Sequence, residues 1–388
     1  MQGFRFAISG FGIISACGNN ISETISNFSS KKRNCGKLTL FNSNIECPVF
    51  EVKNFNSSSK NMRSLNLAFE AIKQALAESR LLEYKDSLRI GVSLGTTVAS
   101  QLNDIDFYRN YKLKGEAPLD SVNRYLKGNL ADAISRHFGF KGPRCTIVNA
   151  CSSGTDAIGV GLSWLKADFC DAVICGGADE LNLVPLAGFN SLGVVSNELC
   201  KPFDKNRKGL NLGEGAGIII IEKEEICKKR GFSPDLFLNG YGLACDAYHL
   251  TAPRPDGSGL KKAIEKALTE AKIKPSEVSF VNAHGTATRD NDKTEGNVLK
   301  EIFGKDIKFL STKGFTGHTL GAAGGIEAVF TALNLKLGWI PASAGFDEFD
   351  EEIGIAPVTD KTEIKGKYAI STSLAFGGNN SALVISRI

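Results

Sequence analysis

The chain has 388 residues, 42% of them hydrophobic, so it is long enough to bury a large core. A net charge of +4 is too small to indicate nucleic-acid binding, and no apolar run approaches the roughly 18 residues of a membrane span. No signal-peptide pattern is recognised at the N-terminus, and the ten cysteines lack the regular spacing of a disulfide scaffold. We therefore expect a cytoplasmic protein with reduced thiols.

Strand and helix patterns alternate along the chain, which predicts an α/β fold. The first strong helix pattern places Leu67, Ala68, Ile72 and Leu76 at helical spacing. Further on, a buried strand predicted over 145–148 is followed by an apolar helix over 154–165.

The corner between that strand and helix contains Cys151 among small residues, Asn149-Ala150-Cys151-Ser152-Ser153-Gly154. Unpaired N–H groups and the macrodipole at a helix N-terminus favour an anion, so we expect the pKa of this thiol to fall. The small neighbours also let an acyl thioester approach the backbone. The other nine cysteines are expected to be buried and inert, because free cysteine is among the most buried residue types.

A glycine cluster, Gly213-Glu214-Gly215-Ala216-Gly217, precedes the strand pattern 218–221. A dinucleotide-binding loop must instead follow a strand and open a helix, so we expect a structural turn. A charged helix pattern then ends at 228–230, and the segment 231–235 interrupts the chain with glycine and proline. We place a boundary there between two halves, 1–233 and 234–388.

Two histidines and a lysine follow strand patterns in the second half. The strand over 280–283 ends at His284, and the strand over 309–312 ends at Lys313, with His318 five residues on. Ligands of α/β sheets are usually met at the carboxyl ends of strands, so we expect these groups to lie together with Cys151. No CxxC, HxxxH or carboxylate cluster completes a tetrahedral zinc set, and no metal site is predicted. One thiol, two imidazoles and one ammonium suit thiol chemistry on an acyl group.

Seven motifs in order make the chain resemble the β-ketoacyl-acyl-carrier-protein synthases, specifically the elongating type with a Cys-His-His triad. They are Asn149–Gly154, Gly176–Asp179, Lys201–Asp204, Gly213–Gly217, Asn282–Thr286, Lys313–His318 and the terminal Phe376-Gly377-Gly378. The resemblance extends over nearly the whole chain. It implies a thiolase fold with five αβαβα layers and two pseudo-twofold-related halves.

The resemblance also implies a reaction. Cys151 would take an acyl group from acyl carrier protein (ACP), and malonyl-ACP would lose carbon dioxide and condense with it, which makes the chain an acyltransferase. His284 and His318 would donate hydrogen bonds to the enolate oxygen. The backbone N–H groups of Cys151 and Phe376 would hold the tetrahedral oxyanion.

The resemblance also implies roles for residues near Cys151, His284 and His318. Lys313 would organise the site through hydrogen bonds, and Glu327 would order Lys313. Thr286 and Thr288 match threonines that bind the phosphopantetheine arm of the carrier, so no bound cofactor is implied. The alternative for Gly285–Thr288 is a turn whose hydroxyls cap the backbone. Four basic residues are candidates for docking the acidic carrier: Lys60, Arg63, Lys205 and Arg207.

Two segments depart from the family pattern. Ala375 stands where elongating synthases more often have glycine, so we expect a stiffer loop at Phe376. Residues 120–129 lack the Phe-Phe-Val-Pro type of segment that helps form the acyl pocket and dimer surface. The substrate can then differ from ordinary saturated acyl chains, which leaves fatty acid, polyketide and polyene elongation open.

Three functions from different classes remain. The leading one is a condensing enzyme, expected to be a homodimer. The second is a subunit of a heterodimer of a ketosynthase and a chain length factor, although non-catalytic subunits usually replace the active cysteine. The third is a coenzyme A-dependent thiolase, which generally has a second cysteine where this chain reads Phe376–Asn379. Initiating synthases carry asparagine where His318 stands.

Overall fold

The computed structural model describes residues 5–57, 62–100 and 104–388. Its strands are β1 (Phe6–Ser15), β2 (Ile90–Gly95), β3 (Arg144–Ile147), β4 (Ala172–Asp179), β5 (Gly215–Lys223), β6 (Leu236–Cys245), β7 (Val278–Asn282), β8 (Phe309–Leu310), β9 (Trp339–Ile340), β10 (Thr362–Glu363), β11 (Tyr368–Ala375) and β12 (Asn379–Arg387).

The helices are α1 (Ile21–Ser29), α2 (Arg63–Ser79), α3 (Ile105–Lys114), α4 (Asp120–Lys127), α5 (Leu130–Phe138), α6 (Ser153–Lys166), α7 (Leu183–Ser191), α8 (Glu224–Lys229), α9 (Ser258–Ala271), α10 (Arg289–Phe303), α11 (Lys313–Thr316) and α12 (Ala323–Leu337). Short 3₁₀ helices are η2 (Leu81–Tyr84), η4 (Pro275–Glu277) and η5 (Leu320–Ala322).

The two halves of the sheet have the same topology. Among the described residues, one half has the strand order β3-β2-β4-β5-β1 and the other β8-β7-β11-β12-β6. In each half the first two pairings are parallel and the last two antiparallel. The halves join where β1 pairs with β6 over 6–8 and 236–238. This repeat is the pseudo-twofold design of the thiolase fold.

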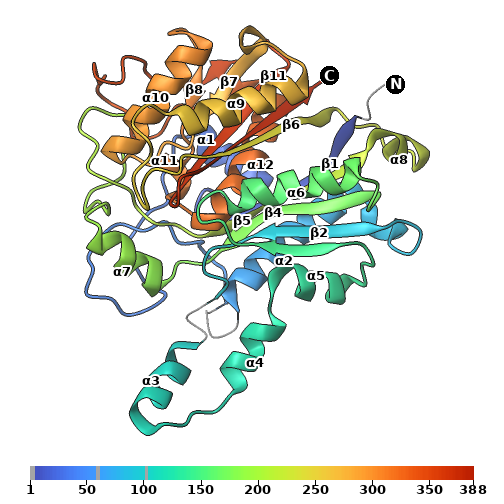
Figure 1. The fold of residues 1–388 in the computed structure, drawn as a ribbon, viewed down its shortest axis with the longest axis vertical. Coiled ribbons are helices and arrows are strands. Elements are labelled where there is room, and N and C mark those ends of the chain that lie inside the picture. The colour runs from blue at the N-terminus through green and yellow to red at the C-terminus, as the bar shows by residue number, and fades with distance from the viewer. Residues whose placement is uncertain (1–4, 58–61, 101–103) are drawn as a thin grey trace.

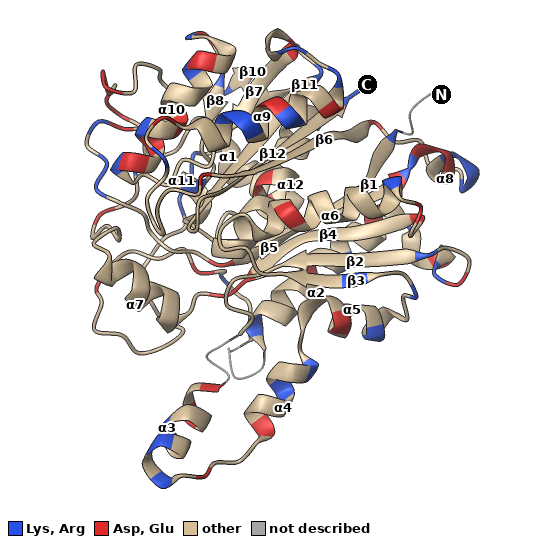
Figure 2. Ribbon diagram, viewed as in Figure 1, with Lys and Arg blue, Asp and Glu red and all other residues tan. Residues whose placement is uncertain are grey.

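Five layers are stacked in Figure 1, with α6 and α12 between the two halves of the sheet. Helices α9 and α10 cover the outer face of the upper half, and α2 and α5 cover that of the lower half. The run Ile218–Ile221 is buried throughout because β5 packs against α2 on one face and α12 on the other. Charged residues fall mainly on the outer helices and loops (Figure 2). The predicted α/β, five-layered thiolase fold is confirmed.

Strand β3 differs from the prediction of a buried strand. It lies at the edge of the sheet and pairs with β2, and Cys145, Thr146 and Ile147 are half-buried while Arg144 is exposed. Next to it, Val148 is 68% exposed. An edge strand with uncovered side chains is a surface on which another chain can pair.

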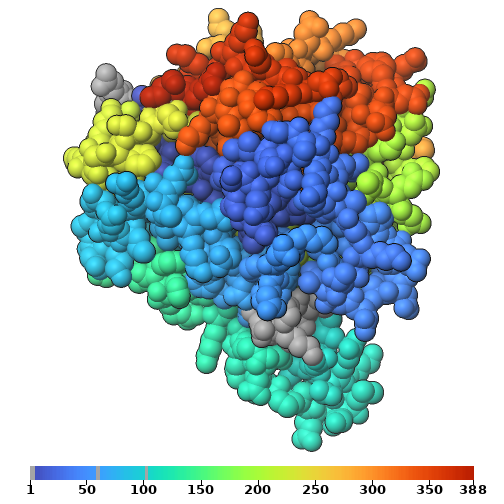
Figure 3. Space-filling view, turned by 180° about the vertical axis from the view of Figure 1, so that it is seen from behind, coloured from blue at the N-terminus to red at the C-terminus, as the bar shows by residue number. Residues whose placement is uncertain are grey.

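Helices α3 and α4 project from the body as an arm, which is also seen from behind (Figure 3). Neither helix contains a buried residue. Large apolar side chains of the arm are more than half exposed: Tyr108, Tyr111, Leu113, Leu119 and Leu126. Residues 120–129, the segment that departs from the family pattern, form α4 and the start of the turn into α5.

Two further observations concern the whole chain. Within the described ranges, no helix is both long and apolar enough to cross a membrane. All ten cysteines lie in those ranges and are free thiols. Contrary to the prediction that nine are buried, Cys245 is exposed and Cys35, Cys47 and Cys145 are half-buried.

Candidate active site

Cys151 lies in the turn between β3 and α6, as the sequence predicts. The turn is tight: Ala150 adopts a left-handed φ of 49°, and the backbone carbonyl of Ala150 accepts a hydrogen bond from Ser153 Oγ at 2.6 Å. Gly154 allows α6 to approach the other half, because a Cβ there would lie 2.7 Å from the backbone nitrogen of Gly325. The thiol is therefore placed at the junction of the two halves.

His284, Lys313 and Glu327 form a buried chain of polar contacts in the second half. Lys313 Nζ lies 2.7 Å from the carbonyl oxygen of His284 and 3.0 Å from His284 Nδ1. It also forms an ion pair with Glu327 Oε1. Each of the three side chains is nearly inaccessible to solvent. Glu327 is thus buried and paired with Lys313, the contact that the family resemblance implies.

The hydrogen bonds fix the tautomers of both histidines. A lysine ammonium is only a donor, so His284 Nδ1 accepts and Nε2 carries the proton. His318 Nδ1 accepts from the backbone N–H of Leu320 at 3.2 Å, so its Nε2 also carries the proton. The two rings lie 5.3 Å apart, nearly perpendicular. Both histidines therefore have one N–H available for donation.

Both imidazoles are neutral. Burial lowers the pKa of His284 well below its ordinary value, and the charge of Lys313 and the neighbouring His318 lower it further. Burial and Lys313 lower the pKa of His318 in the same way. At neutral pH the site therefore holds two uncharged N–H donors.

One cavity of about 430 Å³ brings together the residues that the sequence singled out. Its lining includes Cys151, His284, His318, Thr286, Thr288, Ala375 and Phe376. Lys313 and Glu327 do not line it and lie behind His284. Among the described residues, no group of His, Cys, Asp and Glu is arranged to hold a metal ion.

The expected fall in the pKa of Cys151 is wrong. Burial raises the pKa of this thiol to about 12, and the opposing effects of the Lys313 charge and of a hydrogen bond from the Phe376 backbone N–H are smaller. Helix α6 begins at Ser153, and the loss of water around the sulfur outweighs the contacts that favour the thiolate. The resting site therefore holds a thiol rather than a thiolate.

The conformation of the loop at Phe376 accommodates alanine at position 375, and the stiffer loop expected from the sequence stays a prediction. The left-handed conformations fall on Gly377 and Gly378, with φ of 85° and 80°, and Ala375 ends β11 with a negative φ. Alanine therefore causes no strain at this position. The Phe376 ring packs against Phe189, with centroids 5.2 Å apart.

The two threonines lie on one wall of the cavity. Their hydroxyl oxygens are 2.9 Å apart, and Thr286 is buried while Thr288 is half-buried at the start of α10. Both line the cavity and can meet a polar ligand that enters it.

The sequence reasoning missed two buried carboxylates that shape the site. Glu295 accepts hydrogen bonds from the backbone N–H groups of His284 and Gly285, each at 2.8 Å. Asp179 accepts from the backbone N–H of Gly321 at 2.7 Å and that of Thr97 at 2.8 Å. Asp179 ends a glycine-rich motif, which was a usable signal, whereas Glu295 lies within an ordinary polar helix pattern.

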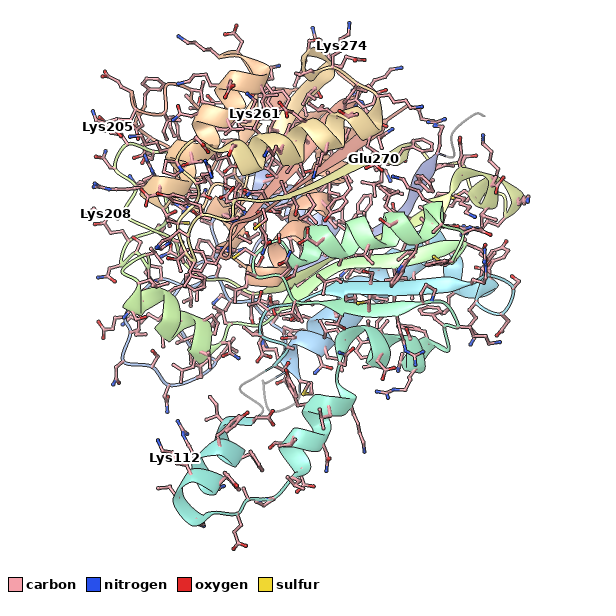
Figure 4. The ribbon with its side chains drawn as sticks, viewed as in Figure 1. Lys112, Lys205, Lys208, Lys261, Glu270 and Lys274 are labelled. Atoms are coloured by element: carbon pink, nitrogen blue, oxygen red, sulfur yellow. The ribbon has the colours of Figure 1, made fainter. Side chains whose placement is uncertain are left out.

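The candidate docking residues are partly corrected. Arg63 is buried in an ion pair with Glu214, and Arg207 is buried against Asp350, so neither presents a charge to a partner. Lys60 lies outside the described residues. Lys205 is exposed beside Glu348. Figure 4 shows Lys205 and Lys208 on the same edge, both pointing outward, and Lys208 also lines the cavity.

Comparison with known families matches the chain in two parts. Residues 5–226 match the beta-ketoacyl synthase N-terminal domain, and residues 237–347 match the beta-ketoacyl synthase C-terminal domain. A 3-oxoacyl-[acyl-carrier-protein] synthase 2 of Staphylococcus aureus (strain MRSA252) is 32% identical, over 100% of this chain and 99% of that protein.

The chain is also similar to solved structures over nearly its whole length. A chain of the ishigamide ketosynthase/chain length factor superposes with a TM-score of 0.92 at 28% identity, with 99% of each chain covered. The ketosynthase ApeO in complex with its chain length factor ApeC, from Xenorhabdus doucetiae, gives a TM-score of 0.85 at 29% identity, with 99% of this chain and 98% of that chain covered. From the two family matches and the full-length relative, the chain belongs to the β-ketoacyl synthase family of acyltransferases.

Proposed function

We propose that this protein is a β-ketoacyl-ACP synthase, which condenses an acyl group held on Cys151 with malonyl-ACP. The observation that carries the proposal is the arrangement in one cavity of a thiol and two neutral histidines with their Nε2–H groups available. The 3-oxoacyl-ACP synthase 2 relative supports the choice of carrier-bound substrates.

In the first step, Cys151 Sγ attacks the carbonyl carbon of the acyl thioester. The new S–C bond forms, the bond to the pantetheine sulfur breaks, and the thiol proton ends on the departing pantetheine sulfur. The Phe376 N–H lies against Cys151, and with the Cys151 N–H it forms the oxyanion site for the tetrahedral intermediate.

In the second step, the malonyl carboxylate leaves as carbon dioxide and its electron pair forms an enolate. The enolate carbon attacks the carbonyl carbon of the acyl-cysteine, the new C–C bond forms as the S–C bond breaks, and the Cys151 thiolate takes up a proton from solvent. His284 and His318 donate their Nε2–H groups to the enolate oxygen. Neutral donors suit this role because they stabilise the negative oxygen without giving up a proton.

Lys313 and Glu327 act on the histidines rather than on the substrate. Lys313 Nζ donates a hydrogen bond to His284 Nδ1, which keeps the proton of the imidazole on Nε2. Its charge also lowers the pKa of both histidines. Glu327 balances that charge inside the protein, where an unpaired ammonium would be costly.

The substrates arrive on the phosphopantetheine arm of ACP, so no further cofactor is needed. We assign Thr286 and Thr288 to hydrogen bonds with that arm, since both line the cavity. Three exposed basic residues suit an acidic carrier. Lys208 and Arg289 line the cavity, and Lys205 lies on the same edge of the molecule as Lys208. The reaction needs a reduced thiol, which supports a cytoplasmic location.

The catalytic unit is proposed to be a dimer with a second copy of this chain. The position of β3 at the sheet edge and the exposed apolar side chains of the α3–α4 arm support a protein partner. Each copy combines Cys151 from residues 1–233 with His284 and His318 from residues 234–388. The two relatives solved with chain length factors make a heterodimer the competing assembly.

The test is product formation from a panel of acyl-ACPs with malonyl-ACP, read by mass spectrometry of the carrier. The account predicts a β-ketoacyl-ACP with wild-type protein and none with Cys151→Ser. His318→Ala should slow the reaction by about 100- to 1000-fold, the usual cost of one such donor. Turnover of acyl-coenzyme A but not of acyl-ACP would contradict the proposal and favour a thiolase.

A further inference from the structure

The oxyanion site is assembled from two loops in different halves of the protein. The Cys151 N–H belongs to the turn before α6, and the Phe376 N–H belongs to the loop between β11 and β12. That second loop contains Gly377 and Gly378, both in left-handed conformations, and hydrogen bonds to Leu250 and Asp246 hold its backbone within the second half. A fixed separation of the two N–H groups therefore requires an anchor between the loops.

Such an anchor is present three residues after Phe376. Asn379 Nδ2 donates to Asn149 Oδ1 at 2.7 Å, which joins the Phe376 loop directly to the turn that holds Cys151. Asn149 Nδ2 in turn donates to Asp156 Oδ2 at 2.5 Å. The hydroxyl of Ser152, the residue after Cys151, lies 2.7 Å from the same Asp156 oxygen.

Asp156 is buried in α6 and ties these groups to the second half. Its Oδ1 accepts from the Tyr241 hydroxyl at 2.9 Å and from Ser381 Oγ, which lie on β6 and β12. An ionised carboxylate is only an acceptor, so it orients every one of these donors toward itself. Asn149 must then turn its Nδ2 to Asp156 and its Oδ1 to Asn379.

We propose that Asp156, acting through Asn149 and Asn379, is a positioning residue that locks the Phe376 loop against the Cys151 turn. The inference rests on the proposed function for its role in acyl transfer. We name the contact from Asp156 through Asn149 to Asn379 the loop latch. The loop latch fixes the positions of the two N–H donors of the oxyanion site, which serve acylation of Cys151. Decarboxylation depends instead on His284 and His318, which the loop latch does not contact.

The two half-reactions separate a positioning role from a structural one. In Asn379→Ala, acyl transfer from acyl-ACP to Cys151 should slow by about 10- to 100-fold, as expected for a small misplacement of a donor. Decarboxylation of malonyl-ACP without an acyl primer should keep the wild-type rate. Tyr241→Phe is the matched control, because it removes a donor to Asp156 but leaves the loop latch intact, and its acylation rate should be unchanged.

A second readout does not depend on any carrier substrate. The pH profile of Cys151 alkylation by iodoacetamide, followed by mass mapping of that peptide, reports the thiol pKa. Because the Phe376 N–H lowers this pKa, Asn379→Ala should shift the profile to higher pH and Tyr241→Phe should not.

Three outcomes would overturn the loop latch. They are a wild-type alkylation profile in Asn379→Ala, a wild-type acylation rate in that variant, or an equal loss of acylation and decarboxylation. If wild-type protein takes no acyl group from any carrier, the proposed function fails, and the alkylation profile still decides whether the loop latch positions Phe376.

Discussion

Burial controls the chemistry of the reactive side chains. Cys151 was predicted from its place before a helix to have a lowered pKa, but removal of water raises that pKa instead. For His284 and His318 the same loss of water favours the neutral form. Sequence patterns located these residues correctly and could not supply their charge states, because burial depends on both halves of the fold.

Glu327 should be essential for stability because it is the charge partner of buried Lys313. Glu327→Gln leaves an ammonium uncompensated in the interior, so the free energy of unfolding should fall by about 3 to 5 kcal/mol. Chemical denaturation measures this. Glu348→Gln is the matched control, since it breaks the solvent-exposed pair with Lys205 and should leave stability unchanged. Equal effects of the two variants would contradict the buried pairing.

His318 should make the protein less stable in mild acid. Its pKa is lowered in the folded state, so below the ordinary value of 6.5 the unfolded chain binds a proton that the folded chain does not. From about pH 7.5 to about pH 5.5 this one group removes about 1.4 kcal/mol of stability. Over the same pH range, the His318→Asn variant should lose about 1.4 kcal/mol less stability than wild type, as measured by chemical denaturation. Parallel losses would show that His318 titrates normally.

At the scale of elements, glycines set the contact between α6 and α12, which carry the site from each half. A Cβ at Gly154 would lie 2.7 Å from Gly325 N and 2.8 Å from Gly321 O, both backbone atoms. The helix pattern over 154–165 predicts α6 but not its contact with α12. The partners of each small residue follow from the pairing of the halves, which periodicity does not encode.

Gly154→Ala should therefore destabilise the protein by about 1 to 3 kcal/mol through overpacking. Gly188→Ala is the control: Gly188 is an exposed residue of α7, a Cβ there meets no atom within 4 Å, and its φ is not left-handed. This change should stabilise by about 0.5 to 1 kcal/mol because alanine is the better helix former. Thermal unfolding of both variants measures the difference, and a tolerated Gly154→Ala would refute the close helix contact.

For the whole molecule, the sequence motifs predicted the fold class and the meeting of Cys151 with His284 and His318. They failed for Arg63 and Arg207, which look like surface charges in a polar sequence context and are buried ion pairs in the structure. Their partners, Glu214 and Asp350, are more than 140 residues away. Long-range pairing of charges leaves no local pattern that a sequence reading can use.

The α3–α4 arm is considered at this scale because its large apolar side chains, among the described residues, are more than half exposed. We predict a dimer in sedimentation velocity that the double change Leu113→Ser and Leu126→Ser converts to monomer. Val184→Ser, at a 55% exposed position of α7, should leave the dimer intact. A wild-type monomer would refute self-association, and a stable complex only with a chain length factor would favour the heterodimer.

The central claim is that Cys151 carries the acyl chain between the two steps. The direct measurement is the intact mass of the protein after incubation with acyl-ACP, with peptide mapping of the adduct, before and after malonyl-ACP is added. The account predicts one acyl group on Cys151, absent in Cys151→Ser, that disappears as β-ketoacyl-ACP forms. An adduct at another residue, or no adduct from any acyl-ACP, would contradict it.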